Sequence, residues 1–575
     1  MVRRTLACLE EQRGVVLILS IFVLLLLTTL GLAFLTTAAT ENTIAVNYRN
    51  HVQAFYAAEA GVESGVVSLK SLVGANPTPT DAQLAGLLPP ALTDPNYTFN
   101  AFQVQRVRTV APYSYQTTLT TGAYAGLMAW TTDYEVTATV TGPRGSQARV
   151  TQKLQHVGIP LFQFMGFYGR GVDLELSPGP AMTITGRIHS NSNLYLKAGD
   201  GGLKIDSYAT TTGDIYRYVK GYPDRGKNPQ IKDANGVYQT LNFDHEYNYD
   251  FASKWSESDW TSAALKAFGG RVQDSSMSVQ EILPPIPDTL YDPKNADKSS
   301  HLMIEKGSVS DSPALKDAKI YYQADLRIED GQGHAKDGST VNLNKCKKGG
   351  GGDAVETKTF WDGREKKMMT VTEVDVGVLD ACGVMPANGI LYVSRGDADG
   401  AVRLVNGSKL PSQGLTVVSG NPVYIQGDYN TVNKVPASVL GDAITVLSNN
   451  WEKNGYDKKG KDVTSSRKAA ATTVNAAFAT GPSHESVMDK SNGQMNNLIR
   501  FLEHWTSVDF TYNGSLVALW HSQQAKEWFR CCGDGGDLYY TPPNRIWSYE
   551  TLFNTNQPPG TPMGTIYLRG QWTEG

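Results

Sequence analysis

The chain has 575 residues, a formal net charge of −4 and 19% charged residues, so it is long enough for two or more domains. No block of lysine and arginine offers a surface for phosphate groups, which argues against nucleic acid as the main partner. The low share of charged residues, with 56 glycines and 28 tyrosines, favours an extracellular, β-rich protein.

The longest apolar run covers residues 15–39 and contains no charged residue. A helix of about 20 residues spans the hydrocarbon core of a bilayer, so this run predicts a transmembrane segment. No proline follows until Pro77, which predicts one continuous helix over residues 15–73. A secretory signal peptide has a shorter apolar region and a small-residue cleavage site, and this argues against one here. A plain single-span anchor is the remaining alternative.

Two motifs on this helix resemble type IV pilins. Gly14 separates a short basic leader, residues 1–14, from the apolar run, as in the leaders that prepilin peptidase cuts after a glycine. The sequence FYAAEAG resembles a stretch of the PilX-type minor pilin N-terminal domain, and its residues are Phe55, Tyr56, Ala57, Ala58, Glu59, Ala60 and Gly61. The resemblance implies a mature chain that begins at a methylated Val15. It also implies a single-pass stage in the bacterial inner membrane, followed by assembly into a pilus at the cell surface.

One position departs from the pattern of the major pilins. Most of them carry a glutamate at the fifth position of the mature chain, where this sequence has Leu19. PilX-like proteins and the K-type pseudopilin of type II secretion also tend to lack it. The resemblance thus implies a minor pilin or pseudopilin at the tip or in initiation of a type IV pilus or related filament. Its expected partners are other pilins and the assembly machinery, and Leu19 and residues 55–61 are the expected assembly residues.

Beyond the helix, residues 97–160 show alternating apolar and polar positions, with a turn signal at Gly142–Gly145. This pattern predicts a small antiparallel sheet containing a hairpin. A long helix followed by such a sheet matches the plan of a pilin head, so the predicted fold class is α+β.

Residues 165–575 contain three-to-five-residue apolar segments separated by glycine and asparagine, which predicts a β-solenoid similar to a right-handed β-helix. Irregular spacing leaves a β-sandwich or jelly roll as the alternative. An insertion is expected over about 199–388, with helices over Trp255–Phe268 and, further on, Asn497–Trp505. The sequences GRIHSN, NPVYIQGDYN, LSNNW and PPNRIW resemble the C-terminal region of large PilX-like proteins, which implies placement and no chemistry.

Four cysteines follow the leader: Cys346, Cys382, Cys531 and Cys532. An even number in an exported chain favours up to two disulfides, for which three pairings exist. A bridge between the adjacent Cys531 and Cys532 would strain the peptide between them. A zinc site is the alternative, although the chain has no CxxC pair.

Few residues suggest catalysis or ligand binding. Asp397 and Asp399 precede Gly400 in the way that calcium loops begin, so calcium is the single cofactor considered. His189 and Ser190 are adjacent and would point to opposite faces of a strand, so we expect the His-Ser-Asn sequence to stabilise a turn. No paired carboxylates can be chosen, and the chain is expected not to be an enzyme. The alternatives are a pilus-presented adhesin for a glycan, host receptor or abiotic surface, and a surface-anchored β-helix enzyme acting on polysaccharide.

Overall fold

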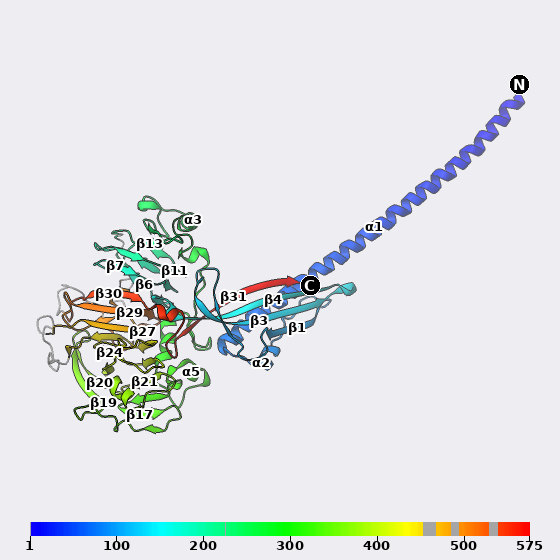
Figure 1. The fold of residues 1–575 in the computed structure, drawn as a ribbon. Coiled ribbons are helices and arrows are strands. Elements are labelled where there is room, and N and C mark those ends of the chain that lie inside the picture. Colours follow the sequence, from blue (N-terminus) through cyan, green and yellow to red (C-terminus); the bar gives the residue numbers. More distant parts are fainter. Residues whose placement is uncertain are drawn as a thin grey trace.

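The computed structural model describes residues 2–222, 224, 226–451, 467–484, 491, 494–527, 529 and 539–575. A long helix projects from a small antiparallel sheet, and a larger β-rich region lies beyond that sheet (Figure 1). The C-terminus lies beside the helix, at the point where the helix reaches the sheet.

The projecting helix, α1, runs without interruption over Val2–Ala75. Its unbroken course agrees with the absence of proline before Pro77. A short helix, α2 (Asp81–Ala85), follows, and Thr80 and Gln83 form a capping box at its start.

The antiparallel sheet has the strand order β1-β3-β4-β31, with β2 also paired to β3. The turn predicted at Gly142–Gly145 is confirmed, since it joins β3 to β4 around the short helix η1 (Pro143–Gly145). The predicted boundaries of 97–160 are too narrow, because β31 lies within the predicted 165–575 domain yet pairs with β4. The strands are β1 (Thr98–Arg106), β2 (Tyr115–Thr118), β3 (Met128–Thr141), β4 (Gln147–Pro160) and β31 (Met563–Glu574).

In the first part of the larger region, successive strands fall into three sheets in turn, and equivalent strands pair in parallel. The first sheet contains β5 (Gly166–Tyr168), β8 (Ile188–Ser190), β11 (Ala209–Thr211) and β15 (Val272–Gln273). The second contains β6 (Leu174–Leu176), β9 (Leu194–Leu196) and β12 (Ile215–Tyr216). The third contains β7 (Met182–Ile184), β10 (Leu203–Ile205), β13 (Gln230–Lys232) and the antiparallel β14 (Tyr238–Thr240).

In the second part, strands alternate between two sheets, again with mostly parallel pairing. One sheet contains β16 (Leu326–Glu329), β17 (Gln332–Ala335), β18 (Thr340–Val341), β21 (Ile390–Ser394), β23 (Leu415–Ser419), β25 (Ala437–Gly441), β27 (Thr472–Thr480), β29 (Asp509–Ala518) and β30 (Asn544–Tyr549). The other contains β19 (Val355–Asp362), β20 (Lys367–Asp375), β22 (Gly400–Val405), β24 (Val423–Gln426), β26 (Ile444–Leu447) and β28 (Arg500–Phe501).

The two parts share one sheet, because β29 near the end of the chain pairs in parallel with β5 at the start of the region. The chain therefore enters this sheet in the middle at β5 and adds strands outward to β15. It then crosses to β16, β17 and β18 at the other end, and later strands return inward to β29. The predicted insertion over 199–388 is not a separate unit, since it contributes strands to these sheets. Between β15 and β16 lie η4 (Ser275–Met277), α4 (Ala296–His301), η5 (Leu302–Ile304), α5 (Pro313–Ala318) and η6 (Ile320–Tyr322).

One predicted helix in the larger region is confirmed and one is wrong. The helix predicted over Trp255–Phe268 is α3 (Glu257–Phe268), with Ser256 as its N-cap. The helix predicted over Asn497–Trp505 is replaced by η8 (Met495–Asn497) and β28, because Arg500 pairs with Thr445 of β26. The remaining elements are α6 (Val376–Ala381), η2 (Leu161–Gln163), η3 (Tyr249–Phe251) and η9 (Thr551–Asn554).

Candidate assembly surface on the N-terminal helix

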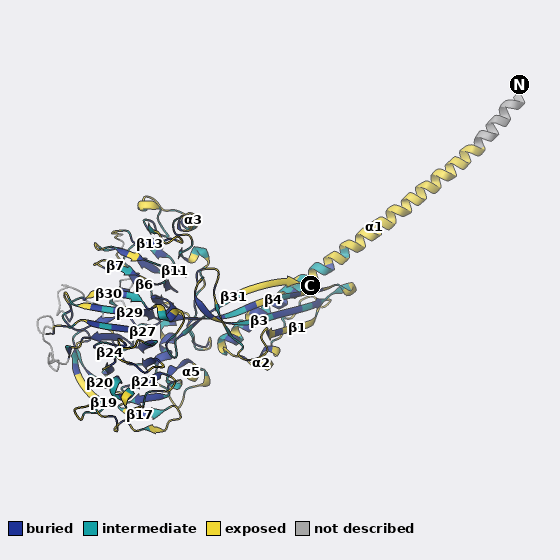
Figure 2. Ribbon diagram, viewed as in Figure 1, coloured by how far each residue is buried: buried dark blue, intermediate teal, exposed yellow. Residues whose placement is uncertain are grey.

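In the first half of α1, every residue from 14 to 45 is exposed, shown in yellow in Figure 2, and most of these side chains are apolar. Leu19 is 63% exposed and Leu35 is 72% exposed, and the apolar side chains between them are similarly open. Among the described residues, α1 is the single helix long and apolar enough to cross a membrane. An apolar surface of this extent marks a region that binds lipid or protein.

The hydroxyl groups of residues 14–45 are hydrogen-bonded within the helix. Each donates a hydrogen bond to a backbone carbonyl three or four residues earlier in the same helix, so its polar group is satisfied internally. The segment can therefore enter an apolar environment without leaving these donors unpaired. The residues are Ser20, Thr28, Thr29, Thr36, Thr37, Thr40 and Thr43.

The C-terminal half of α1 is amphipathic, and one face is buried against β3 and β4. The buried positions recur every three or four residues, which keeps them on one side of a helix. They are Ala54, Ala58, Val62, Val66, Leu69 and Val73.

Glycines set the distance between α1 and the sheet. A Cβ added at Gly61 would lie 2.4 Å from the Phe99 ring, and one at Gly65 would lie 2.7 Å from Val136. At Gly14, by contrast, an added Cβ meets no atom within 4 Å. Packing within the chain thus accounts for Gly61 and Gly65 but not for Gly14.

The Phe55–Gly61 stretch is divided between the two faces of α1. Ala58 and Gly61 are buried against the sheet, so they are unavailable to a neighbouring subunit and the expectation that they contact one is corrected. Tyr56 and Ala60 are exposed, while the side chains of Phe55, Ala57 and Glu59 are half-buried.

The C-terminal strand β31 pairs with β4 and also contacts α1, and the sequence did not predict this arrangement. The Trp572 ring lies 5.8 Å from the Phe55 ring. The Tyr567 hydroxyl donates to the Lys70 carbonyl at 3.3 Å. Alternating positions in Met563–Leu568 could have indicated a strand, but nothing local identifies β4 and α1 as its neighbours.

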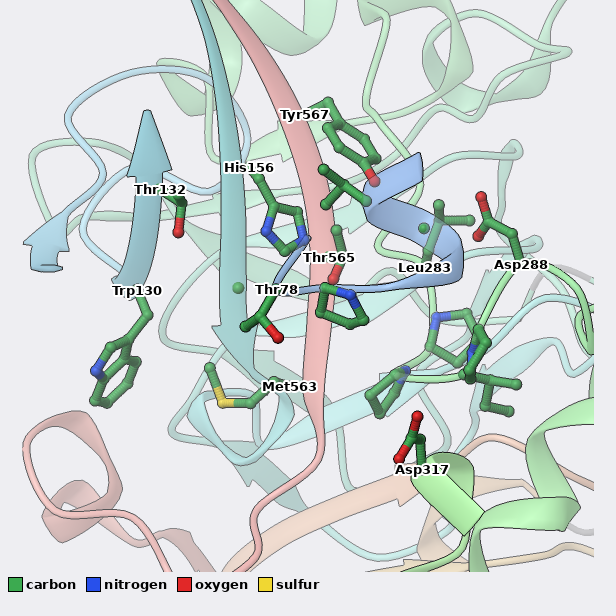
Figure 3. A pocket seen from close by; sticks show the side chains of 18 of the residues that line it. Thr78, Trp130, Thr132, His156, Leu283, Asp288, Asp317, Met563, Thr565 and Tyr567 are labelled. Carbon is green, nitrogen blue, oxygen red and sulfur yellow. The ribbon is translucent and has the colours of Figure 1, made fainter. Parts of the chain in front are cut away.

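A cleft of about 500 Å³ lies where α1, the sheet and the segment after β15 meet (Figure 3). Its walls are mainly apolar, and His156 of β4 and Thr565 of β31 are among its lining residues. Burial lowers the pKa of His156 to about 4, so its ring is neutral at pH 7. Asp288 lies against Gly74 at the end of α1, and its backbone amide donates to the Gly74 carbonyl at 3.0 Å.

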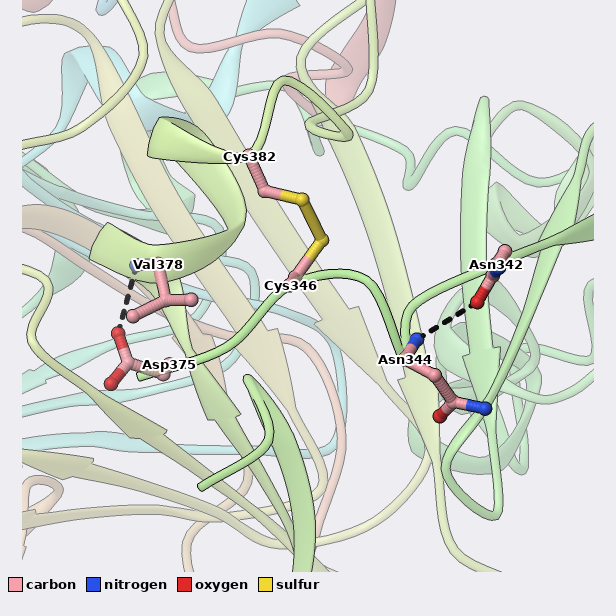
Figure 4. The surroundings of a disulfide bond; sticks show 6 residues. All are labelled: Asn342, Asn344, Cys346, Asp375, Val378 and Cys382. Carbon is pink, nitrogen blue, oxygen red and sulfur yellow. Dashed lines mark hydrogen bonds between the residues drawn. A yellow bond between two sulfur atoms is a disulfide. The ribbon is translucent and has the colours of Figure 1, made fainter. Parts of the chain in front are cut away.

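The structure pairs two of the four candidate cysteines, Cys346 and Cys382, in a disulfide (Figure 4). Cys382 directly follows α6, whose first turn is capped by Asp375, since its carboxylate accepts from the Val378 amide at 2.9 Å. Cys531 and Cys532 lie outside the described residues, so their pairing stays a prediction.

The two aspartates of the predicted calcium loop lie beside cations of the protein itself. Asp397 accepts a hydrogen bond from the Arg395 guanidinium. Asp399 lies 3.0 Å from the Lys367 ammonium group. Calcium would have to compete with these ion pairs for both carboxylates.

His189 has a structural role. It is fully buried in β8, and its two ring nitrogens lie 2.9 Å from the Thr210 hydroxyl and 2.9 Å from the Asn191 side-chain oxygen. Burial lowers its pKa to about 4. The Asn191 side chain in turn donates to the Ile282 carbonyl at 2.7 Å. The His-Ser-Asn sequence thus ties β8 to the segment that crosses between the two parts, and it forms no catalytic dyad.

Comparison with known proteins supports the pilin resemblance at the N-terminus. Residues 13–63 match the family model described as PilX N-terminal. The chain is also similar to the "Crystal structure of competence-associated pilin ComZ from Thermus thermophilus", with 12% identity over 92% of this chain and 97% of that chain. The TM-score is 0.29, too low to support a shared fold. No curated protein sequence matches the chain. The matched residues span the exposed apolar surface and the Phe55–Gly61 stretch, so residues 13–63 of this chain are similar to the PilX N-terminal family.

Proposed function

We propose that this chain is a PilX-like minor pilin or pseudopilin that assembles through α1 into a type IV pilus or related filament. The observation that carries the proposal is the division of α1. Its first half presents apolar side chains with internally satisfied hydroxyl groups, and its second half is fixed to the head. Such a helix can lie in the inner membrane before assembly and among neighbouring pilin helices afterwards, without any change in the head.

We place the chain at the tip or in initiation of the filament. In pilin assembly, the glutamate at the fifth mature position is thought to pair with the N-terminal amine of the subunit above. An unpaired charge in an apolar helix bundle is costly. A subunit with no neighbour above needs no such glutamate, which fits the exposed, apolar Leu19. The bulk of the head also favours an end position over the close spacing of the shaft.

The larger region is proposed to be a β-solenoid. Support comes from the recurrence of parallel strands in three sheets in the first part and in two sheets in the second. Asn406 and Asn430 have φ of 54° and 56°, as tight corners between strands require. A solenoid of this size exceeds what assembly requires, which supports display of an adhesin for a glycan or a surface as the alternative function.

Immunogold labelling of isolated filaments with an antibody against the head tests the proposal. We expect a few particles per filament, all at one end, and loss or impairment of filaments in a deletion strain. Leu19→Glu should alter position or assembly, while Leu17→Glu, an equally exposed neighbour, controls for the added charge alone. Even labelling along the shaft would overturn the tip position. The pilin function would be overturned if the deletion strain made normal filaments and no filament of the wild type carried the protein.

A further inference from the structure

Three segments far apart in the sequence bring two histidines and an aspartate together in the larger region. β27 and β29 are parallel neighbours, so the turns that follow them lie at the same edge of their sheet. His484 lies in the first of these turns and His521 in the second. Asp297 reaches the same place from the first turn of α4.

The distances among these three side chains are close to those of a metal site. One candidate ligand atom from each lies within 4.8 Å of the other two. Nδ1 of His521 is 3.2 Å from a carboxylate oxygen of Asp297. Two ligands of a tetrahedral zinc ion, each about 2.0–2.2 Å from the metal, are separated by roughly 3.3–3.5 Å. The His521–Asp297 pair is therefore already close to this spacing. The His484 ring stacks on that of His521, with centroids 4.4 Å apart, so the His484 ring has to turn for one of its nitrogens to face the same ion.

The buried carboxylate of Asp442 positions the backbone that carries two of these three residues, Asp297 and His521. It accepts hydrogen bonds from the backbone amides of Gln523, Gln524 and Ala525, at 2.5, 3.1 and 3.2 Å, and from the Ser522 hydroxyl. These bonds hold the turn that carries His521. The same carboxylate lies 3.2 Å from Nε2 of His301, one turn after Asp297 on α4. Asp442 thus positions α4 and the His521 turn relative to each other.

The turn that carries His484 is tied to the same point. The Ser522 amide donates to the Pro482 carbonyl at 2.9 Å, and the Gly481 amide donates to the Asp442 carbonyl at 3.1 Å. The two turns approach so closely that a Cβ at Gly481 would lie 2.5 Å from the Ser522 nitrogen. Position 481 therefore tolerates no side chain, and the backbone that carries His484 is fixed beside that of His521.

We propose that Asp297, His484 and His521 bind a divalent transition metal of the zinc class. Two imidazoles and one carboxylate suit zinc, whereas calcium prefers an all-oxygen shell. The ion would cross-link α4 to the turns after β27 and β29. His484 is exposed, so the fourth position is open to water. The site is separate from α1 and independent of the pilin proposal.

The described residues contain a second group of this kind, Asp214, His245 and Asp274, which serves as the internal control. It has a single imidazole, and its carboxylates are already engaged. Asp274 accepts from the Ser276 amide at 3.1 Å, and Asp214 accepts from the Ser275 hydroxyl at 2.8 Å. We expect this second group to act as a hydrogen-bond network.

The test uses the full chain, purified in detergent and freed of metal. Zinc chloride is titrated by calorimetry, and cobalt(II) chloride is added separately so that its visible absorption reports nitrogen ligands. We expect one tightly bound ion per chain. His484→Ala and His521→Ala should each weaken binding roughly tenfold or more, while His245→Gln should leave it unchanged.

A second measurement separates lost ligands from lost folding. Metal-free wild type and the His484→Ala/His521→Ala double variant should melt at similar temperatures, and zinc should raise the Tm of the wild type alone. The proposal is overturned if the wild type binds no zinc or if the double variant binds it as tightly. It also fails if His245→Gln removes binding while the double variant keeps it.

Discussion

Arg569 of β31 donates two hydrogen bonds to the carboxylate of Glu63 on α1, at 2.5 and 2.7 Å. The paired geometry fixes the direction in which the last strand crosses the helix. Because both side chains are about half exposed, the ion pair itself contributes little stability. The attachment of α1 to the sheet must therefore come mainly from the buried apolar face next to this contact.

The apolar face is tested with two neighbouring valines. Val66 is fully buried against the sheet, while Val67 is 65% exposed. Val66→Ala should lower the free energy of unfolding by roughly 1–3 kcal/mol, from lost burial and the cavity that remains. Val67→Ala makes the same chemical change and should cost less than about 0.5 kcal/mol. Urea unfolding of the two variants provides the comparison, and equal effects would contradict this packing.

Processing is tested at Gly14. We expect mass spectrometry of the native protein to show an N-terminal, methylated Val15. Gly14→Leu should leave the leader attached and the protein in the inner membrane, whereas Gly14→Ala should be processed, if slowly. Neither substitution should disturb the fold, since a Cβ at this position meets no atom within 4 Å. Native protein that still carries residues 1–14 would refute the prediction.

The disulfide between Cys346 and Cys382 closes a loop with a sequence separation of 36. Loop-closure entropy assigns such a bridge about 3–4 kcal/mol. The free energy of unfolding of the Cys346→Ala/Cys382→Ala double variant should be lower by about this amount. Because the variant lacks this bridge, reducing agent should destabilise it less than the wild type. Peptide maps without reductant should join the peptides that contain the two residues; free thiols at both positions in exported protein would count against it.

Stability should fall at alkaline pH through His301. Burial favours its neutral form, but hydrogen bonds to Asp442 and Glu305 outweigh burial and raise the pKa of His301 from 6.5 to about 9. The charged form is thus favoured by folding. Its stabilisation is complete below about pH 6.5 and disappears as the pH rises through about 9, a loss on the order of 3 kcal/mol.

Urea unfolding near pH 6 and near pH 10 measures this loss. The His301→Gln variant should be less stable at the lower pH and should show a smaller difference between the two. His334→Gln, on β17, serves as the control for histidine removal. A wild type and a His301→Gln variant with the same pH dependence would contradict the assignment.

The sequence predicted the elements whose signals are local. The charge-free run predicted α1, the glycines at 142 and 145 predicted the turn between β3 and β4, and the segment Trp255–Phe268 predicted α3. It failed where a distant partner decides the structure. Arg500 and Phe501 carry no local strand signal, and β26 makes them a strand. The absence of proline before Pro77 predicted the length of α1, but the packing of β31 against the same helix could not be predicted.

The candidate metal site could not be predicted from the sequence for the same reason. His484 and His521 can be recognised as neighbours only when the pairing of β27 with β29 is known. Asp297 can be added to them only when the position of α4 is known. No spacing in the sequence connects these three residues.

The pairing of β5 with β29 has a consequence for the folding of an incomplete chain. Until β29 is present, β5 has one edge of unpaired backbone groups, and such edges promote aggregation. The Ser515 hydroxyl, which donates to the Phe164 carbonyl, closes this junction across a sequence separation of 351. The first part of the larger region therefore cannot complete its sheet before the end of the chain is present. For the proposed filament subunit, we expect truncated chains that lack β29 to be degraded rather than assembled.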